Sequence, residues 1–242
     1  MSRARGGARP LLRELRARFP ALEDPAQAVL EGRVLVDGRP ILNPESLVKA
    51  GASVSVRASG SLRGAAKLRA ALDRFAVPVT GRVALDLGAS TGGFTSALLA
   101  RGAARVYAVD VGHGQLLGSL RQDERVVNLE STNLAQLDRR LLPEPVQLVT
   151  ADLSNLALAR AVPQLDAALL AADAELVALV KPMFELGLGR PPATAELLAG
   201  AVERAASGVA SAGWDVLGDM RSPLAGAGGA VEFFLHARRN SA

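Results

Sequence analysis

The first 58 residues carry short hydrophobic patterns separated by polar residues. Apolar side chains recur at helical spacing in the first part of this region, and short β-prone runs follow. Asp37-Gly38 stands between two of these runs, which predicts a hairpin with a tight turn. The predicted elements are helices over 9–19 and Pro25–Glu31 and strands over Arg33–Val36, Arg39–Leu42 and Ala52–Arg57. The pattern predicts a small α+β domain over 1–58.

Beyond a Ser/Gly-rich linker at 59–63, apolar strand segments alternate with helical ones. The predicted strands are Arg82–Asp86, Arg105–Asp110, Arg125–Glu130, Gln147–Asp152, Leu176–Lys181, Trp214–Met220 and Ala230–Ala237. The predicted helices include Ala66–Phe75, Thr95–Arg101 and a stretch with Leu198, Val202, Ala205 and Val209 on one face. This alternation predicts an α/β fold over 64–242, a doubly wound and mostly parallel sheet whose last strand is antiparallel.

Charge is distributed unevenly along the chain. Residues 1–74 contain 14 Lys/Arg and 7 Asp/Glu, whereas residues 75–242 contain 14 and 17. A basic N-terminal region on a mildly acidic body favours a polyanionic partner bound through that region. A solvated arginine-rich surface is the alternative explanation.

Composition excludes several classes of site. The chain has no cysteine and two histidines, which argues against a disulfide framework, a thiolate or histidine metal site and a catalytic thiol. No run approaches the roughly 18 consecutive apolar residues of a membrane span, and the basic N-terminus lacks the apolar core of a signal peptide. We therefore expect a cytoplasmic protein with neither membrane nor metal.

A glycine-rich turn follows the first strand of the large domain. Gly88, Gly92 and Gly93 let the backbone approach a ligand closely, and the next helix begins there with unpaired N–H groups. Asp110 ends the second strand, where an acid can accept ribose hydroxyls. The spacing G-x-x-x-G-G departs from the dinucleotide G-x-G-x-x-G and favours S-adenosylmethionine over NAD. The candidate cofactor-binding residues are Asp86, Gly88, Ser90, Thr91, Gly92, Gly93, Phe94 and Asp110.

Four ionic residues form the second candidate constellation. Only three of the 28 basic side chains are lysine, and two of these, Lys67 and Lys181, lie in patterned segments. Asp152, Lys181 and Glu232 interrupt otherwise apolar strands, at positions that a parallel sheet brings to its ligand-binding edge. Lys67 would reach this edge from the helix before the first strand. A surface salt bridge is the structural alternative for each residue alone.

The chemistry of these groups suits removal of a proton from a weak acid. Arginine stays protonated, whereas a lysine can become a neutral amine when buried or beside another cation. A neutral Lys181 could accept a proton from a ribose 2′-hydroxyl, with Lys67 favouring that neutral form by repulsion and stabilising the alkoxide. Asp152 and Glu232 would oppose this repulsion, so we assign them the orientation of the two amines.

Together these segments resemble the hemolysin-A-like (TlyA) family, which joins a small RNA-binding domain to an FtsJ/RrmJ-type methyltransferase. The resemblance covers nearly the whole chain. It rests on R-G-A-A-K-L (63–68), D-L-G-A-S-T-G-G-F-T (86–95), D-V-G-H-G-Q-L (110–116), A-D-L-S (151–154), V-K-P-M-F-E (180–185) and V-E-F-F-L (231–235). It implies a Rossmann-like S-adenosylmethionine-dependent methyltransferase fold, 2′-O-methylation of cytidine in ribosomal RNA and a catalytic tetrad at Lys67, Asp152, Lys181 and Glu232. It also implies that Asn133 contacts the adenine edge.

The chain departs from the family pattern in its N-terminal domain and in one loop. The small domain resembles the αL RNA-binding fold of ribosomal proteins, but Glu23-Asp24 stands where that fold has Ser-Arg, which should weaken phosphate contact. The loop after Glu185 is shorter than in the family. One alternative is therefore an RNA-binding protein whose methyltransferase fold is inactive. An NAD-dependent dehydrogenase is disfavoured by the glycine spacing, and no amphipathic cationic stretch supports a membrane-lytic role.

Overall fold

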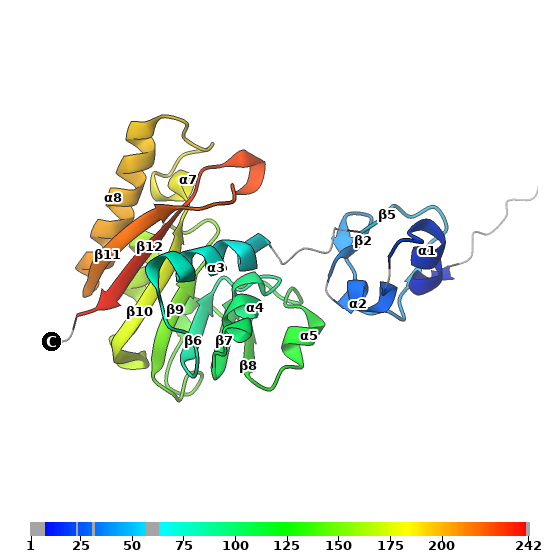
Figure 1. Cartoon of the computed structure of the whole chain (residues 1–242), viewed down its shortest axis with the longest axis horizontal. Coiled ribbons are helices and arrows are strands. Elements are labelled where there is room, and N and C mark those ends of the chain that lie inside the picture. The colour runs from blue at the N-terminus through cyan, green and yellow to red at the C-terminus, as the bar shows by residue number, and fades with distance from the viewer. Residues whose placement is uncertain (1–7, 23, 31, 57–62, 241–242) are drawn as a thin grey trace, which may run out of the picture. The chain divides into compact units, whose positions relative to one another are not determined.

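The computed structural model in Figure 1 describes residues 8–22, 24–30, 32–56 and 63–240, with the side chain of Gln27 left out. Within it the chain forms two compact units. Residues 1–60 group with 117–122, and residues 61–116 group with 123–242. The predicted linker at 59–63 lies outside the described residues except for Arg63, and so does Glu23.

The first unit is built from short elements around a small apolar core. The elements are β1 (Arg9–Pro10), α1 (Leu11–Arg18), α2 (Pro25–Leu30), β2 (Val34–Val36), β3 (Arg39–Pro40), β4 (Leu47–Val48), β5 (Val54–Val56) and the later helix α5 (Gly118–Arg121). Strands pair as β3-β2-β5 and β1-β4. Leu11, Leu15 and Val29 are fully buried in the core, which explains the helical spacing of the leucines.

The predicted hairpin is present between β2 and β3. Both turn residues have positive φ, 50° at Asp37 and 78° at Gly38, as a type I′ turn requires. Asp37 Oδ1 also accepts a hydrogen bond of 2.9 Å from the Ser53 amide, which joins the turn to the segment before β5. The predicted helix over 9–19 is shorter, because Arg9 and Pro10 form β1 and α1 begins at Leu11. The sequence also missed β4, whose two residues are too few to show alternation and are not marked by a hairpin turn as β3 is.

The second unit contains a seven-stranded sheet. Its strands are β6 (Val83–Leu87), β7 (Arg105–Asp110), β8 (Val126–Glu130), β9 (Val146–Ala151), β10 (Leu170–Val180), β11 (Trp214–Arg221) and β12 (Phe233–Arg239). Their order is β11-β12-β10-β9-β6-β7-β8. The pairs from β8 through to β10 are parallel, and β12 runs antiparallel to both of its neighbours. The predicted fold class is confirmed.

Helices cover both faces of this sheet (Figure 1). They are α3 (Arg63–Phe75), α4 (Gly93–Ala100), α6 (Leu158–Ala161), α7 (Pro182–Glu185) and α8 (Ala195–Ser211), with 3-10 turns η1 (Leu134–Gln136), η2 (Val162–Gln164), η3 (Ala167–Leu169) and η4 (Ala227–Gly229). Alternate strand residues point to opposite faces. Leu85 and Val149 share a core with Val209 of α8, whereas Asp86 faces α4 and accepts a hydrogen bond from Thr95.

Two glycines allow α3 and α4 to pack closely. A Cβ on Gly93 would lie 3.1 Å from the Gly64 Cα, so a side chain there would press on the backbone of α3. Lys67 is one turn beyond Gly64 on α3. The glycine contact therefore sets how near this lysine comes to the sheet.

The start of β10 was predicted six residues too late. Asp173 and Glu175 interrupt its apolar pattern, yet the strand begins at Leu170. Glu175 is buried because it has two partners: Arg82 Nη1 lies 2.9 Å from Oε1, and His236 Nε2 lies 2.8 Å from Oε2. The His236 ring stacks on Phe75 at 5.1 Å. This cluster ties β6, β10, β12 and α3 together.

Glu175→Ala should lower the free energy of unfolding by about 3 kcal/mol, because it leaves the half-buried Arg82 charge and the buried His236 ring without their shared carboxylate. Asp73→Ala is the matched control: it breaks a 2.6 Å ion pair with Arg101, but the Asp73 side chain is 70% exposed, and the expected cost is under about 1 kcal/mol. Denaturant unfolding of both variants measures the difference. Equal losses would show that the buried cluster does not stabilise the sheet.

Candidate active site

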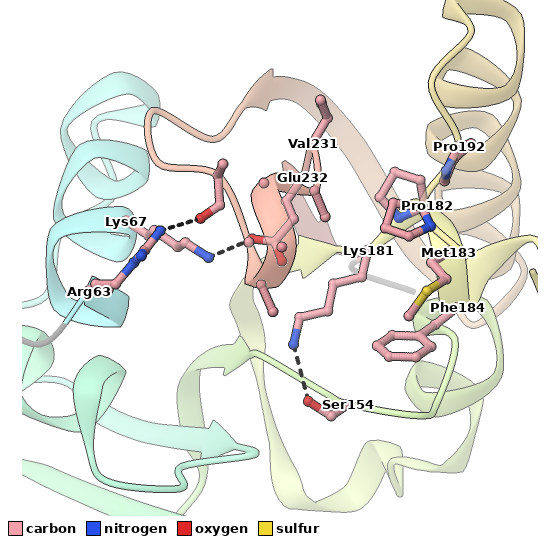
Figure 2. Close-up of a pocket in the computed structure, with 17 residues that line it drawn as sticks. Arg63, Lys67, Ser154, Lys181, Pro182, Met183, Phe184, Pro192, Val231 and Glu232 are labelled. Carbon is pink, nitrogen blue, oxygen red and sulfur yellow. Dashed lines mark hydrogen bonds and ion pairs between the residues drawn. The ribbon is translucent and has the colours of Figure 1, made fainter. Parts of the chain in front are cut away.

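A pocket of about 720 Å³ lies at the edge of the sheet where β9 and β10 end (Figure 2). Lys181 directly follows β10 and precedes α7, and Asp152 directly follows β9. Glu232 is the residue directly before β12, and Lys67 reaches the pocket from α3. Because β12 is antiparallel to β10, its beginning lies at the edge where β10 ends. We call this cavity the acceptor pocket.

The four predicted ionic residues form two ion pairs. Lys67 Nζ lies 2.5 Å from Glu232 Oε2, and both residues are buried, with relative exposures of 7% and 6%. Lys181 Nζ lies 2.5 Å from Asp152 Oδ1 and also donates to Ser154 Oγ at 3.3 Å. Asp152 Oδ1 is buried and makes no aligned hydrogen bond with the described residues, so the Lys181 charge compensates it. Lys67, Lys181 and Glu232 all line the acceptor pocket, and Figure 2 shows both amines pointing into it.

The loop before Glu232 packs directly on its carboxylate. A Cβ on Gly226 would lie 2.1 Å from Glu232 Oε1, so only glycine allows this approach. The Glu232 carbonyl accepts from the Ser222 amide at 2.8 Å, which anchors the other end of the loop. Arg63 Nη2 donates to the Ala225 carbonyl at 2.8 Å. Residues 225–231 thereby form a wall of the acceptor pocket.

A second pocket, of about 490 Å³, lies beside the glycine-rich turn. We call it the turn pocket. Gly88, Ser90, Asp110 and Asn133, four of the predicted cofactor-binding residues, line it. Gly88 has a φ of 80°, and a Cβ there would lie 2.4 Å from the Asp152 carbonyl oxygen. This glycine lets the turn pack against the end of β9.

Two polar side chains in the turn pocket also hold its loops. Asp110 accepts hydrogen bonds from the amides of Ser90 (2.8 Å, at Oδ2) and Gly112 (2.7 Å, at Oδ1). Asn133 caps η1, its Oδ1 accepting from the Ala135 amide at 3.0 Å. Each carboxylate oxygen has two lone-pair sites, so Asp110 retains acceptor capacity for ligand hydroxyls.

The other predicted cofactor-binding residues do not line the turn pocket. Gly92 is the N-cap of α4, with a φ of 95°. Gly93 contacts α3, and Phe94 is buried with its ring 6.0 Å from that of Phe234. Thr91 lies in the turn between β6 and α4. Gly93 and Phe94 thus pack against α3 and β12, and cofactor contact remains a prediction for all four residues.

Asp86 also lies behind the turn pocket, fully buried. Its carboxylate accepts hydrogen bonds from Thr95 Oγ1 at 2.6 Å and from Thr150 Oγ1 at 3.1 Å. Burial raises the pKa of Asp86 to about 7, although both threonine hydrogen bonds oppose that rise. Asp86 therefore connects β6, β9 and α4 directly beneath the turn.

The two pockets adjoin at the Lys181–Asp152 pair. Ser154 lines both pockets, whereas Asp152 lines the turn pocket and Lys181 the acceptor pocket. A ligand in the turn pocket therefore lies next to one held beside the two amines. Sequence reasoning assigned no role to Ser154, to the 225–231 wall or to Gln115, which lines the turn pocket and accepts a hydrogen bond of 3.1 Å from Ser90 Oγ at its Oε1. Ser154 and Gln115 stand inside the quoted motifs, but the wall consists mainly of glycine and alanine and carries no chemical signal.

No group of three or more His, Cys, Asp or Glu side chains in the described part of the chain could hold a metal ion. Among the same residues, no helix has the length and hydropathy needed to cross a bilayer.

Comparison with known proteins identifies the family. The model of the FtsJ-like methyltransferase family matches residues 61–239. The chain belongs to this family. A curated relative in Mycobacterium tuberculosis, the 16S/23S rRNA (cytidine-2′-O)-methyltransferase TlyA, is 48% identical over 173 residues, or 69% of this chain and 64% of the relative. The chain thus aligns with less than two thirds of that protein. Hemolysin A of Brachyspira hyodysenteriae is 33% identical over 176 residues, or 69% of this chain and 71% of that relative, and the chain belongs to the hemolysin A/TlyA group.

Solved structures share the fold. A Streptococcus thermophilus protein described as a candidate hemolysin superposes with a TM-score of 0.72 at 29% identity, covering 98% of this chain and 90% of the other. Magnesium protoporphyrin IX methyltransferase from Synechocystis, solved with bound S-adenosylhomocysteine (SAH), superposes with a TM-score of 0.51 at 16% identity. It covers 73% of this chain and 84% of that protein, and at this identity the likeness concerns the fold alone.

Asp86→Asn should remove a pH-dependent loss of stability. With its folded-state pKa raised from 3.8 to about 7, Asp86 keeps a proton that the unfolded chain releases in this window. Stability conferred by that proton is complete below about pH 4 and is lost as pH rises to about 7. The variant cannot ionise at this position. The fall in its free energy of unfolding between pH 4.5 and 8 should therefore be about 2–4 kcal/mol smaller than in the unaltered protein. Denaturant titrations at both pH values measure this, and parallel losses in the two proteins would contradict it.

Proposed function

We propose that this protein transfers a methyl group from S-adenosylmethionine to a ribose 2′-hydroxyl of RNA, with cytidine in ribosomal RNA as the target. The observation that carries the proposal is the pair of lysine–carboxylate ion pairs at the acceptor pocket, directly beside the turn pocket. Membership of the FtsJ-like methyltransferase family supports the reaction class. The M. tuberculosis relative is a cytidine-2′-O-methyltransferase of 16S and 23S rRNA, which supports the ribose and the ribosomal substrate.

The turn pocket fits the proposed cofactor. Gly88 brings backbone to the pocket without a side chain, and the Asp110 carboxylate would accept the ribose hydroxyls of the adenosine. Asn133 lines the same pocket, as an adenine contact requires. When bound, S-adenosylmethionine would supply an electrophilic methyl group. The Synechocystis methyltransferase, which shares this fold, holds SAH, the demethylated form of that cofactor.

In the acceptor pocket the two amines would act on the 2′-hydroxyl. Lys181 would first release the proton of its ion pair with Asp152 to solvent. The free amine would then take up the hydroxyl proton as the oxygen forms its bond to the methyl carbon and the carbon–sulfur bond breaks. Lys67, held by the buried Glu232, would stabilise the negative charge that develops on the oxygen. Asp152 and Ser154 orient Lys181 from the side of the turn pocket.

The first unit would supply contacts to the RNA backbone. Arg13 and Arg16 of α1 are exposed, and neither has an ion-pair partner among the described residues. Arg18, by contrast, pairs with Glu14 at 2.5 Å. We propose residues 1–58 as an RNA-binding domain of the αL type and 64–242 as the methyltransferase domain.

Lys181→Arg should keep cofactor affinity but lose methyl transfer by about 100-fold or more, because arginine cannot become a general base at neutral pH. Incorporation of tritiated methyl groups into stripped ribosomal subunits measures turnover, and calorimetry measures cofactor binding. Near-normal turnover in the variant would show that Lys181 acts only through its charge. If the unaltered protein binds RNA and incorporates no label, the alternative of an inactive methyltransferase fold holds.

Arg13→Gln combined with Arg16→Gln should lower the salt dependence of RNA binding. Each phosphate contact that is lost should reduce the slope of log K against log salt by roughly 0.7–0.9. Filter binding of ribosomal RNA fragments at several salt concentrations measures the slope, with the paired Arg18→Gln as comparison. An unchanged slope in the double variant would show that Arg13 and Arg16 of α1 do not contact RNA phosphates.

A further inference from the structure

A third cavity, of about 350 Å³, lies next to the acceptor pocket and is not used by the proposed chemistry. Its walls come from α6, α7 and α8. Met183 and Phe184 line both this cavity and the acceptor pocket, so the two are separated only by this short part of α7. Two cations, Arg160 of α6 and Arg204 of α8, belong to its lining. We call it the arginine cavity.

The two arginines are brought together by a close helix contact. A Cβ on Gly208 would lie 2.4 Å from the Ala159 Cα, so α8 touches the backbone of α6 at this point. Arg204 is four residues before Gly208 and therefore lies on the same face of α8. Arg160 directly follows Ala159. The contact places one arginine from each helix at the cavity.

The acid in this cavity is already engaged. Glu185 is 2% exposed and accepts hydrogen bonds from the backbone amides of Leu158 and Ala159 at the start of α6. Burial raises the pKa of Glu185, although its two backbone hydrogen bonds and the nearby charge of Arg204 oppose that rise. Neither Arg160 nor Arg204 forms an ion pair within the described ranges. The cavity thus presents two exposed guanidinium groups, and the carboxylate in its lining, that of Glu185, is already hydrogen-bonded to the start of α6.

We propose that Arg160 and Arg204 bind a backbone phosphate of the RNA strand adjacent to the target nucleotide. This inference rests on the proposed function, since the target ribose must occupy the acceptor pocket for its neighbour to reach the arginine cavity. Guanidinium groups bind phosphate through paired hydrogen bonds. The cavity, of about 350 Å³, has room for a phosphodiester group between the two guanidinium groups. Phosphate contacts fix the position of a strand without reading its sequence.

The test compares Arg160→Gln, Arg204→Gln and the double variant in the full chain, with ribosomal RNA fragments as the probe. Each single variant should lower the salt slope of RNA binding by roughly 0.7–0.9 and raise KM for RNA several-fold. Cofactor affinity by calorimetry should stay unchanged, and kcat should stay within about two-fold, because neither residue touches the reacting atoms. Replacing both arginines by lysine should give the salt slope of the unaltered protein but only part of its RNA affinity, since lysine cannot bind phosphate in a bidentate manner.

Arg140→Gln is the matched control. It removes one positive charge from an exposed arginine that pairs with Asp138 at 2.6 Å, in the segment before β9 and hence at the opposite edge of the sheet. If the salt slope of RNA binding in the double variant equals that of Arg140→Gln, the proposal is overturned. So would loss of binding to ribosomal subunits with unchanged binding to protein-free RNA, which would assign the cavity to a ribosomal protein. Failure of the unaltered protein to methylate any RNA would count against the proposed function, while the slopes would still decide whether the cavity binds RNA.

Discussion

The close backbone contact between Gly88 and Asp152 is the constraint on which the arrangement of both main pockets depends. At this point the glycine-rich turn touches the residue that ends β9, and a Cβ would overlap the Asp152 carbonyl. The Asp152 amide donates in turn to the Leu87 carbonyl at 2.9 Å. One short stretch of backbone therefore sets the distance between the turn pocket and the ion pair of the acceptor pocket. Methyl transfer needs such control, because the reacting atoms must approach within a few tenths of an ångström of the productive geometry.

The two ion pairs differ in their surroundings, and this difference matches the separate roles that we propose. Lys67 and Glu232 are almost completely buried, and removing two charges from water is costly unless their mutual geometry is good. Lys181 and Asp152 are more exposed, at 18% and 27% of their side chains, and lie where the two pockets adjoin. A fixed charge suits electrostatic stabilisation, whereas a group that exchanges protons needs access to substrate and solvent.

The residues around the pockets support this arrangement without touching a ligand. Asp86 joins two strands and a helix beneath the turn, Gly226 lets a loop pack on Glu232, and Glu185 holds the start of α6 beside α7. The contacts of Asp86 with Thr150 and of Glu185 with Leu158 join segments far apart in the chain, whereas Gly226 lies in the loop directly before Glu232. The walls of the pockets are consequently determined by the same buried contacts that stabilise the second unit.

Much of this structure followed from local pattern. Alternating apolar strands and helices predicted the doubly wound sheet, because periodicity reports directly which face of each element is buried. The tetrad could be predicted because lysine is rare in this chain and because strand ends in a parallel sheet meet at one edge. The first half of β10 was missed, since the buried Glu175 looks polar in sequence and its partners Arg82 and His236 are remote from it.

What only the tertiary structure decided is which residues meet. The sequence grouped Asp86, Gly93 and Phe94 with the cofactor site, and the structure adds the packing contacts that each of them makes with Thr95, Gly64 and Phe234, while their contact with the cofactor stays a prediction. The sequence carried no signal for the 225–231 wall, or for the placement of Arg160 and Arg204 in the lining of one cavity. Local residue types and spacing determine the elements and the chemical groups that the chain carries. Contacts between distant segments depend on how the helices and strands pack, and that packing is a property of the whole fold.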